Sequence, residues 1–195
     1  MRVYHMSQTL QLGSKLKAGY RGNTERCNMF IKALEHSESY LQSMIADMKL
    51  QDDEWREYVK WCVEGIFEFV RKTEFPSLPS RLDCSYYFDS LDCFKPLYEA
   101  GWAQEPEAER AKIRLFEVDL NEENPIKCDM RIFDEAYDIM LDTKNIAAVL
   151  DYARKYFSGQ PSTDPIWEIM SDKHAIAVKD ITDYLVATIK ETHTL

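Results

Sequence analysis

Apolar residues recur along this chain with two spacings, one typical of strands and one typical of helices. The segment 2–6 alternates in the manner of a half-buried strand. The next segment, 7–17, has leucines spaced for a short helix, and Gly19 supplies a stop signal. We therefore predict a strand, a short helix and then a polar loop at the start of the chain.

The segment 24–73 carries the longest helical patterns. Apolar residues recur every three or four positions over 27–48, and a second set does so over 55–70. The acidic sequence QDDE between them favours the start of a new helix, and the prolines of FPSLPS, residues 75–80, end it. We expect two amphipathic helices that pack as a hairpin.

Shorter patterns fill the rest of the chain and predict the fold class. The spacing predicts strands over 82–88, 112–120, 165–170 and 175–181, a short helix or turn over 89–101, and helices over 130–141, 145–157 and 180–190. Short strands interspersed with helices, without strict alternation, are typical of an α+β fold. We predict a single domain over 1–195, with 24–73 as a helical insertion.

Composition and charge exclude several classes of protein. The chain has 195 residues, 45% of them hydrophobic, and can bury one substantial core. No apolar run approaches the roughly 20 residues of a membrane span, and the N-terminal sequence lacks a signal-peptide pattern. Five cysteines without a C-x-x-C pair argue against a metal site and favour reduced thiols in a cytoplasmic protein. A net charge of −10 opposes generic binding to duplex DNA, but it leaves open a locally basic groove for nucleic acid or a basic protein partner.

The candidate chemistry lies in an ordered set of four residues. His5 is in the first predicted strand, Tyr87 ends a middle strand, Tyr98 follows eleven positions later, and Glu168 starts a late strand. This order resembles the His-Tyr-Glu branch of the ADP-ribosyltransferase superfamily. The stretch YYFDSLDCFKPLY is similar to that branch's tyrosine strand and small helix, and WEIMSDKHAIAVKDI is similar to its glutamate strand and the strand that returns from it.

Two further stretches extend the resemblance. The opening YHMSQTLQLGSKLKAG is similar to the start of DarT- and CmdT-like toxins that modify nucleic acids. The stretch FEFVRKTEFPSLPSRLDCSYYF is similar to an uncharacterised bacterial and phage domain family with a P-S-R segment. Together the similar stretches span most of the predicted elements.

The resemblance implies a split β-sheet core, NAD as the cosubstrate and no metal. ADP-ribose transfer proceeds through an oxocarbenium-like transition state, as glycoside cleavage does. Nicotinamide leaves as a neutral molecule from a cationic ring, so no general acid is needed. Glu168 would be the carboxylate facing the developing positive charge. His5 would hydrogen-bond the adenosine-side ribose, with help from Ser7.

The same resemblance assigns the remaining NAD contacts. Tyr87 and Tyr98 would sandwich the nicotinamide ring by stacking. Arg21 and Arg81 would supply cations for the pyrophosphate.

Several alternatives remain open at this point. Tyr86 takes the place of Tyr87 if the strand lies one residue out of register. Glu117 is a rival to Glu168, while Asp119 is more simply a polar residue at a strand end. Ile166 stands two positions before Glu168, where arginine-modifying relatives have Glu or Gln, which disfavours an arginine acceptor.

The expected activity is therefore NAD-dependent mono-ADP-ribosyl transfer by a cytoplasmic toxin or phage-defence effector. The acceptor implied by the resemblance is a base of RNA or DNA, and an antitoxin is an expected protein partner. Two other hypotheses use the same fold. One is an NAD glycohydrolase, and the other is a non-enzymatic module that binds a protein.

Overall fold

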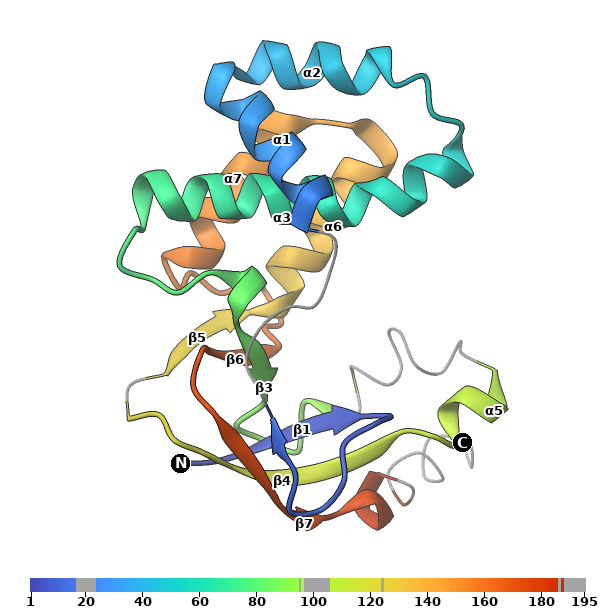
Figure 1. Ribbon diagram of the computed structural model, residues 1–195, viewed down its shortest axis with the longest axis vertical. Helices are drawn as coiled ribbons and strands as arrows, with labels where there is room; N and C mark the ends of the chain where they lie inside the picture. The colour runs from blue at the N-terminus through green and yellow to red at the C-terminus, as the bar shows by residue number, and fades with distance from the viewer. Residues whose placement is uncertain (17–23, 95, 97–105, 124, 186, 188–195) are drawn as a thin grey trace. The chain divides into compact units, whose positions relative to one another are not determined.

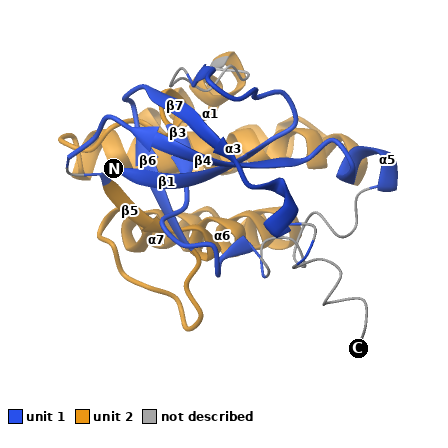
Figure 2. Ribbon diagram, turned by 90° about the horizontal axis from the view of Figure 1, so that it is seen from below, with its two compact units in different colours: residues 1–18, 85–125, 167–195 blue, residues 19–84, 126–166 orange. Residues whose placement is uncertain are grey.

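The computed structural model describes residues 1–16, 24–94, 96, 106–123, 125–185 and 187 (Figure 1). The chain divides into two compact units (Figure 2). Unit 1 comprises residues 1–18, 85–125 and 167–195, and unit 2 comprises residues 19–84 and 126–166. Strands dominate the described part of unit 1 and helices that of unit 2, so the predicted mixture of helices with antiparallel strands is confirmed. The predicted insertion, 24–73, lies in unit 2 together with residues 126–166.

Unit 1 is built on antiparallel strands. They are β1 (Arg2–Ser7), β2 (Lys15–Leu16), β3 (Ser85–Tyr87), β4 (Arg114–Leu120), β6 (Trp167–Ser171) and β7 (Ala175–Asp180), with the short helix α5 (Glu107–Arg110) before β4. Four strands form one sheet in the order β1-β4-β7-β2, and β3 pairs separately with β6. An isolated bridge between Tyr4 and Phe88 joins β1 to the residue after β3.

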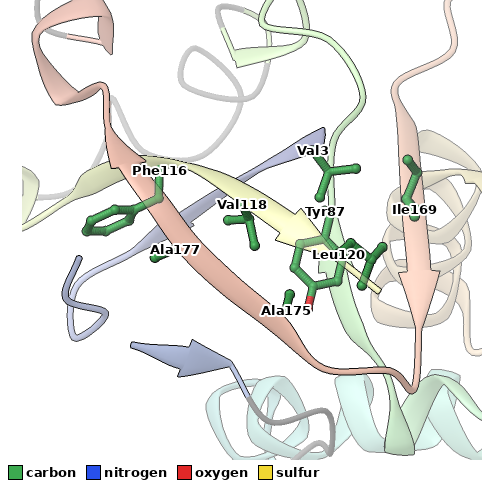
Figure 3. Packing of buried hydrophobic residues seen from close by; sticks show 8 residues of the cluster. All are labelled: Val3, Tyr87, Phe116, Val118, Leu120, Ile169, Ala175 and Ala177. Carbon is green, nitrogen blue, oxygen red and sulfur yellow. The ribbon is translucent and has the colours of Figure 1, made fainter. Parts of the chain in front are cut away.

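The alternation of β1 follows from the core that it faces. Val3 lies opposite Val118, and His5 lies opposite Phe116 on β4. Val3, Phe116 and Val118 belong to a buried cluster with five further residues, Tyr87, Leu120, Ile169, Ala175 and Ala177 (Figure 3). Since alternate residues of a strand share a face, Val3, His5 and Ser7 point to the same side of the sheet.

The helix predicted over 7–17 is wrong for the described residues of that segment. Ser7 ends β1, and its Oγ accepts hydrogen bonds from the backbone N–H groups of Thr9 and Leu10 at 3.1 Å each. Gly13 then adopts a φ of +79°, which favours glycine. The leucine spacing reflects a different cause, because Leu10 packs against the core cluster from the turn and Leu16 does so from strand β2.

The described part of unit 2 is mainly helical. Its elements are α1 (Thr24–His36), α2 (Glu38–Asp47), α3 (Asp52–Glu74), the 3-10 helix η1 (Arg81–Asp83), β5 (Ile126–Asp129), α6 (Met130–Thr143) and α7 (Ile146–Phe157). The first predicted helix is two helices, since Ser37 has an extended backbone and its side chain caps α2 by accepting from Tyr40 N–H. The second is confirmed as α3.

Strand β5 was missed by the sequence analysis, which assigned its four residues to no element. It ends at Asp129, whose side chain is buried. Its carboxylate accepts from the backbone N–H groups of Arg131, Ser162 and Ile166, at 3.1, 2.7 and 3.0 Å. Three backbone donors compensate the burial of that charge.

The predictions for the later strands and helices are largely confirmed. Helices α6 and α7 cover the segments predicted as helical, and β4, β6 and β7 cover three predicted strands. Although β6 and β7 are consecutive, they pair with β3 and β4 respectively, not with each other. Parts of the predicted segments 89–101 and 180–190 lie outside the described residues. Within the described ranges, no helix combines the length and the apolar character needed to cross a bilayer.

Candidate functional site

A pocket of about 470 Å³ lies in unit 1 beside the end of β1. Its lining residues come from two distant stretches of the chain: His5, Ser7, Thr9, Leu10, Ser14, Lys15, Leu16, Ser85 and Tyr86. The described lining residues include one histidine, one lysine and several hydroxyl groups, and none of these described residues is a carboxylate. In a chain of net charge −10, this composition suits a polar or anionic ligand.

His5 is held in the pocket by the neighbouring strand. Its Nδ1 lies 2.9 Å from the backbone carbonyl oxygen of Tyr86. A carbonyl oxygen only accepts, so Nδ1 carries the proton and donates this bond. Burial lowers the pKa of His5, and the Tyr86 hydrogen bond only partly opposes that effect. The ring is therefore neutral near pH 7, and its Nε2 is a lone-pair acceptor.

Ser7 also lines the pocket, but its oxygen already has a structural task. The Oγ accepts from two backbone N–H groups in the turn that follows β1. The hydroxyl proton is the part of Ser7 that a ligand would meet.

The two adjacent tyrosines differ in their surroundings. Tyr87 has 0% of its surface exposed and belongs to the core cluster, where its ring lies beside Leu120 and Ala175 (Figure 3). Its ring centroid is 5.6 Å from that of His5. A fully buried ring presents no face for a nicotinamide to stack on. Tyr86, the alternative left open by the sequence, contributes to the pocket lining.

The register of β3 and β6 determines the side on which Glu168 lies. Tyr87 is opposite Ile169, and Tyr86 is opposite Met170. By strand alternation, Glu168 shares a face of this ladder with Met170 and Tyr86, while Tyr87 points to the other face. Glu168 is 4% exposed and is not among the residues that line the pocket. The structure thus brings His5, Ser7 and Tyr86 together, but it does not bring Glu168 to the same pocket wall.

The other candidate carboxylates on β4 lie on the outer side of the sheet. Glu117 is opposite Tyr4 in the ladder and forms an ion pair with Arg2 at 3.4 Å. Asp119 is exposed and lies 3.9 Å from the N-terminal ammonium group. Neither shares the face of Val3 and His5.

A further carboxylate, Glu122, was missed by the sequence analysis. Its Oε2 accepts a hydrogen bond of 3.2 Å from the hydroxyl of Ser171, and Ser171 is opposite Ser85 in the ladder. By strand alternation, Ser171 shares the face of Ser85 and Tyr87, which is opposite to the face of Tyr86 and Glu168. No sequence motif marks Glu122, which follows β4 in a turn.

Arg81 lies in unit 2, within a cluster of its own. Its guanidinium group donates to Glu64 at 3.0 and 3.2 Å and to the Tyr156 hydroxyl. The same group lies 4.1 Å from the centroid of the Phe133 ring. Arg81 is therefore engaged by protein groups on several sides.

The remaining two predicted NAD-binding residues, Arg21 and Tyr98, lie outside the described residues.

The polar lining residues that sequence reasoning missed are Thr9, Ser14, Lys15 and Ser85. The segment 7–17 was predicted as a helix, and a helix would distribute Ser14 and Lys15 differently from strand β2 and its turn. A prediction of a turn and a short strand after Ser7 would have been needed to find them. Among the described residues, no group of three or more His, Cys, Asp and Glu side chains is placed to hold a metal ion.

Comparison with known families adds one result. A family model described as a protein of unknown function (DUF2441) matches residues 3–183. The chain belongs to the DUF2441 family. No curated protein matches the sequence. The match covers both units, and its description specifies no activity. The ADP-ribosyltransferase resemblance therefore stays a prediction from sequence.

Proposed function

We infer that the pocket beside His5 binds the adenosine side of NAD, and that the chain is an NAD-dependent ADP-ribosyltransferase with an ADP-ribosyltransferase-like split β-sheet. The observation that carries the proposal is the neutral His5 ring, fixed through Nδ1 to Tyr86, in a pocket whose described lining residues supply hydroxyls and no carboxylate. A lone pair on Nε2 accepts a hydrogen bond from a ribose hydroxyl. This is the role that the sequence resemblance gives to His5.

The reaction requires a carboxylate near the anomeric carbon of the nicotinamide ribose. As nicotinamide departs with the electrons of the C–N bond, positive charge develops on the ribose ring, and a carboxylate stabilises it. The resemblance assigns this role to Glu168. Because Glu168 shares a face with Tyr86 and not with Tyr87, Tyr86 replaces Tyr87 as the proposed stacking residue.

The acceptor and the biological setting come from the resemblance alone. A ring nitrogen of an RNA or DNA base attacks the ribose carbon, and the ADP-ribose becomes covalently attached to the base. A cytoplasmic toxin or phage-defence effector with an antitoxin partner fits such an activity.

The experiment that tests the proposal follows NAD labelled in the adenosine part. The purified protein is incubated with labelled NAD and with RNA, single-stranded DNA, protein extract or buffer alone, and nicotinamide release is measured in parallel. Labelling of nucleic acid is expected. Release of nicotinamide without labelling of any macromolecule would instead identify an NAD glycohydrolase.

The matched variants are Glu168→Gln and Glu123→Gln. Glu168→Gln keeps the size of the buried side chain and removes its charge, so a loss of activity of at least about 100-fold is expected in a variant whose far-ultraviolet circular dichroism matches that of the parent. Glu123 is exposed in the turn after β4, and its variant is expected to act like the parent. Full activity of Glu168→Gln would contradict the role of Glu168. If the parent protein does not consume NAD, and NAD does not raise the melting temperature of the parent, the protein-interaction module becomes the better hypothesis.

A further inference from the structure

Two leucines give the pocket beside His5 an apolar side. Leu16 lies on β2 opposite Ala175 of β7, and Ala175 belongs to the buried core cluster. Since paired residues of neighbouring strands share a face, the Leu16 side chain lies on the core side of the sheet, which is also the side of His5. Leu10 comes from the turn after β1, and both leucines are partly buried, pack against the core cluster and line the pocket. Apolar surface therefore continues from the core to the pocket wall.

The polar residues described around this pocket offer no negative charge to a ligand. The His5 ring donates through Nδ1 to the carbonyl oxygen of Tyr86, and none of the described lining residues is a carboxylate. A cationic ring that enters such surroundings loses its hydration without gaining a counter-charge. A neutral aromatic ring loses much less, and it gains from the contact with apolar side chains. The pocket therefore favours a neutral ring over a cationic one.

We propose that Leu10 and Leu16 hold the neutral adenine ring of NAD, and that their apolar surface disfavours the cationic nicotinamide ring in the same pocket. The two leucines thereby select the orientation of the dinucleotide, with its adenosine end beside His5. A volume of about 470 Å³ is within the range of pockets that hold small ligands. This assignment rests on the proposed function, because NAD supplies both rings.

The assignment is tested by calorimetric titration of the parent protein with three nucleosides, without catalytic turnover. They are adenosine, nicotinamide riboside and reduced nicotinamide riboside, which share the ribose. The reduced compound keeps the size of the nicotinamide ring but lacks its positive charge. Adenosine is expected to bind at least about tenfold more tightly than nicotinamide riboside, and the reduced compound at least about threefold more tightly.

Variants of the leucines test which side chains provide this preference. Leu10→Ala and Leu16→Ala each remove apolar surface from the pocket, so each should lower the affinity for adenosine at least about fivefold. Leu16→Met keeps the apolar volume and should bind adenosine within about threefold of the parent. Leu12→Ala is the matched control, because Leu12 belongs to the same segment, is 61% exposed and is not among the lining residues. Far-ultraviolet circular dichroism shows whether each variant folds like the parent.

The assignment is overturned if adenosine binds the parent no better than nicotinamide riboside does, a comparison that depends on no variant. It is also overturned if folded Leu10→Ala and Leu16→Ala bind adenosine like the parent. Failure of the proposed function has a different signature. Leucine-dependent binding of adenosine without any consumption of NAD would leave the adenine site in place and refute the transferase. Conversely, NAD consumption with an unchanged KM in both alanine variants would support the transferase and refute the role of the leucines.

Discussion

Two polar clusters of this protein combine aromatic and hydroxyl groups, yet they differ in how those groups are arranged. In unit 2, the Arg81 cluster joins the guanidinium group to Glu64, to the Tyr156 hydroxyl and to the face of Phe133. In unit 1, His5 donates from Nδ1 to the backbone carbonyl oxygen of Tyr86, and its ring borders a pocket lined by several hydroxyl residues. A cluster whose bonds are satisfied internally stabilises a fold, whereas groups that border a pocket are accessible to a ligand.

The Arg81 cluster explains the P-S-R segment in structural terms. The Ser80 hydroxyl donates to Glu68 at 3.0 Å, and the Arg81 guanidinium binds Glu64, one helical turn earlier on α3. Arg71 also donates to Glu68 through two nitrogens at 2.8 Å each. Two buried glutamates of α3 thus fix the chain that follows the prolines of FPSLPS.

Removal of one partner from the Arg81 cluster is expected to have the largest effect. Arg81→Met leaves the Glu64 carboxylate buried without its cation, which costs about 3–5 kcal/mol in the free energy of unfolding. Urea denaturation followed by circular dichroism measures this value. The double variant Arg81→Met, Glu64→Leu should recover part of the loss, because no charge is then left unpaired.

The control for this effect is an exposed ion pair. Arg154 lies on α7 and pairs with Glu74 at 3.0 Å, with both side chains partly exposed. Arg154→Met should cost no more than about 1 kcal/mol. Equal losses in Arg81→Met and Arg154→Met would show that the Arg81 cluster is not a stabilising unit and would reopen a ligand-binding role for Arg81.

The elements predicted correctly have long or strongly periodic patterns. Helix α3 is amphipathic over 23 residues, and its N-terminus has a capping box formed by Gln51 and Glu54. Strand β1 alternates because one face meets the core. The errors occur where local hydrogen bonds override apolar spacing, as the Ser7 turn does in the segment predicted as a helix.

The candidate site was only partly predictable, for a different reason. His5 stands out in the sequence because an imidazole on a core-facing strand position is unusual. The pocket, however, is assembled from residues 5–16 and 85–86, and its contacts depend on a pairing that local patterns do not specify. Which of the two adjacent tyrosines is buried in the core likewise depends on the register of the strand. Tyr87 is buried and Tyr86 lines the pocket, and a shift of one residue would exchange their positions.

A smaller loss is expected from Ser7→Ala, which removes a hydroxyl that lines the pocket and also holds the turn after β1. The N–H groups of Thr9 and Leu10 lose their acceptor, and the unfolding free energy should fall by about 1 kcal/mol. Thr9→Ala is the matched control, and a change within about 0.5 kcal/mol is expected because Thr9 is exposed. Equal losses of unfolding free energy in Ser7→Ala and Thr9→Ala would show that the Ser7 hydroxyl has no special structural role.

A further predicted effect concerns His5 and pH. Because burial lowers the pKa of His5 in the folded protein, the unfolded chain takes up the His5 proton first as the pH falls. The free energy of unfolding should therefore decrease as the pH drops below about 6.5, by at most about 1.4 kcal/mol per pH unit, and it should recover as the pH rises. Asp180, whose pKa is lowered chiefly by a hydrogen bond from Thr182, adds a loss of stability only in more acid solution, below its unfolded value of 3.8.

Urea denaturation at several pH values measures this dependence. Above pH 4.5, roughly the upper limit of the Asp180 contribution, the unfolding free energy of His5→Gln should change less with pH than that of the parent. His36→Gln, a change at an exposed histidine, should keep the slope of the parent. A slope that persists in His5→Gln would mean that the ring is as protonated in the folded protein as in the unfolded chain, and Nε2 would then be a donor instead of the acceptor that a ribose hydroxyl requires.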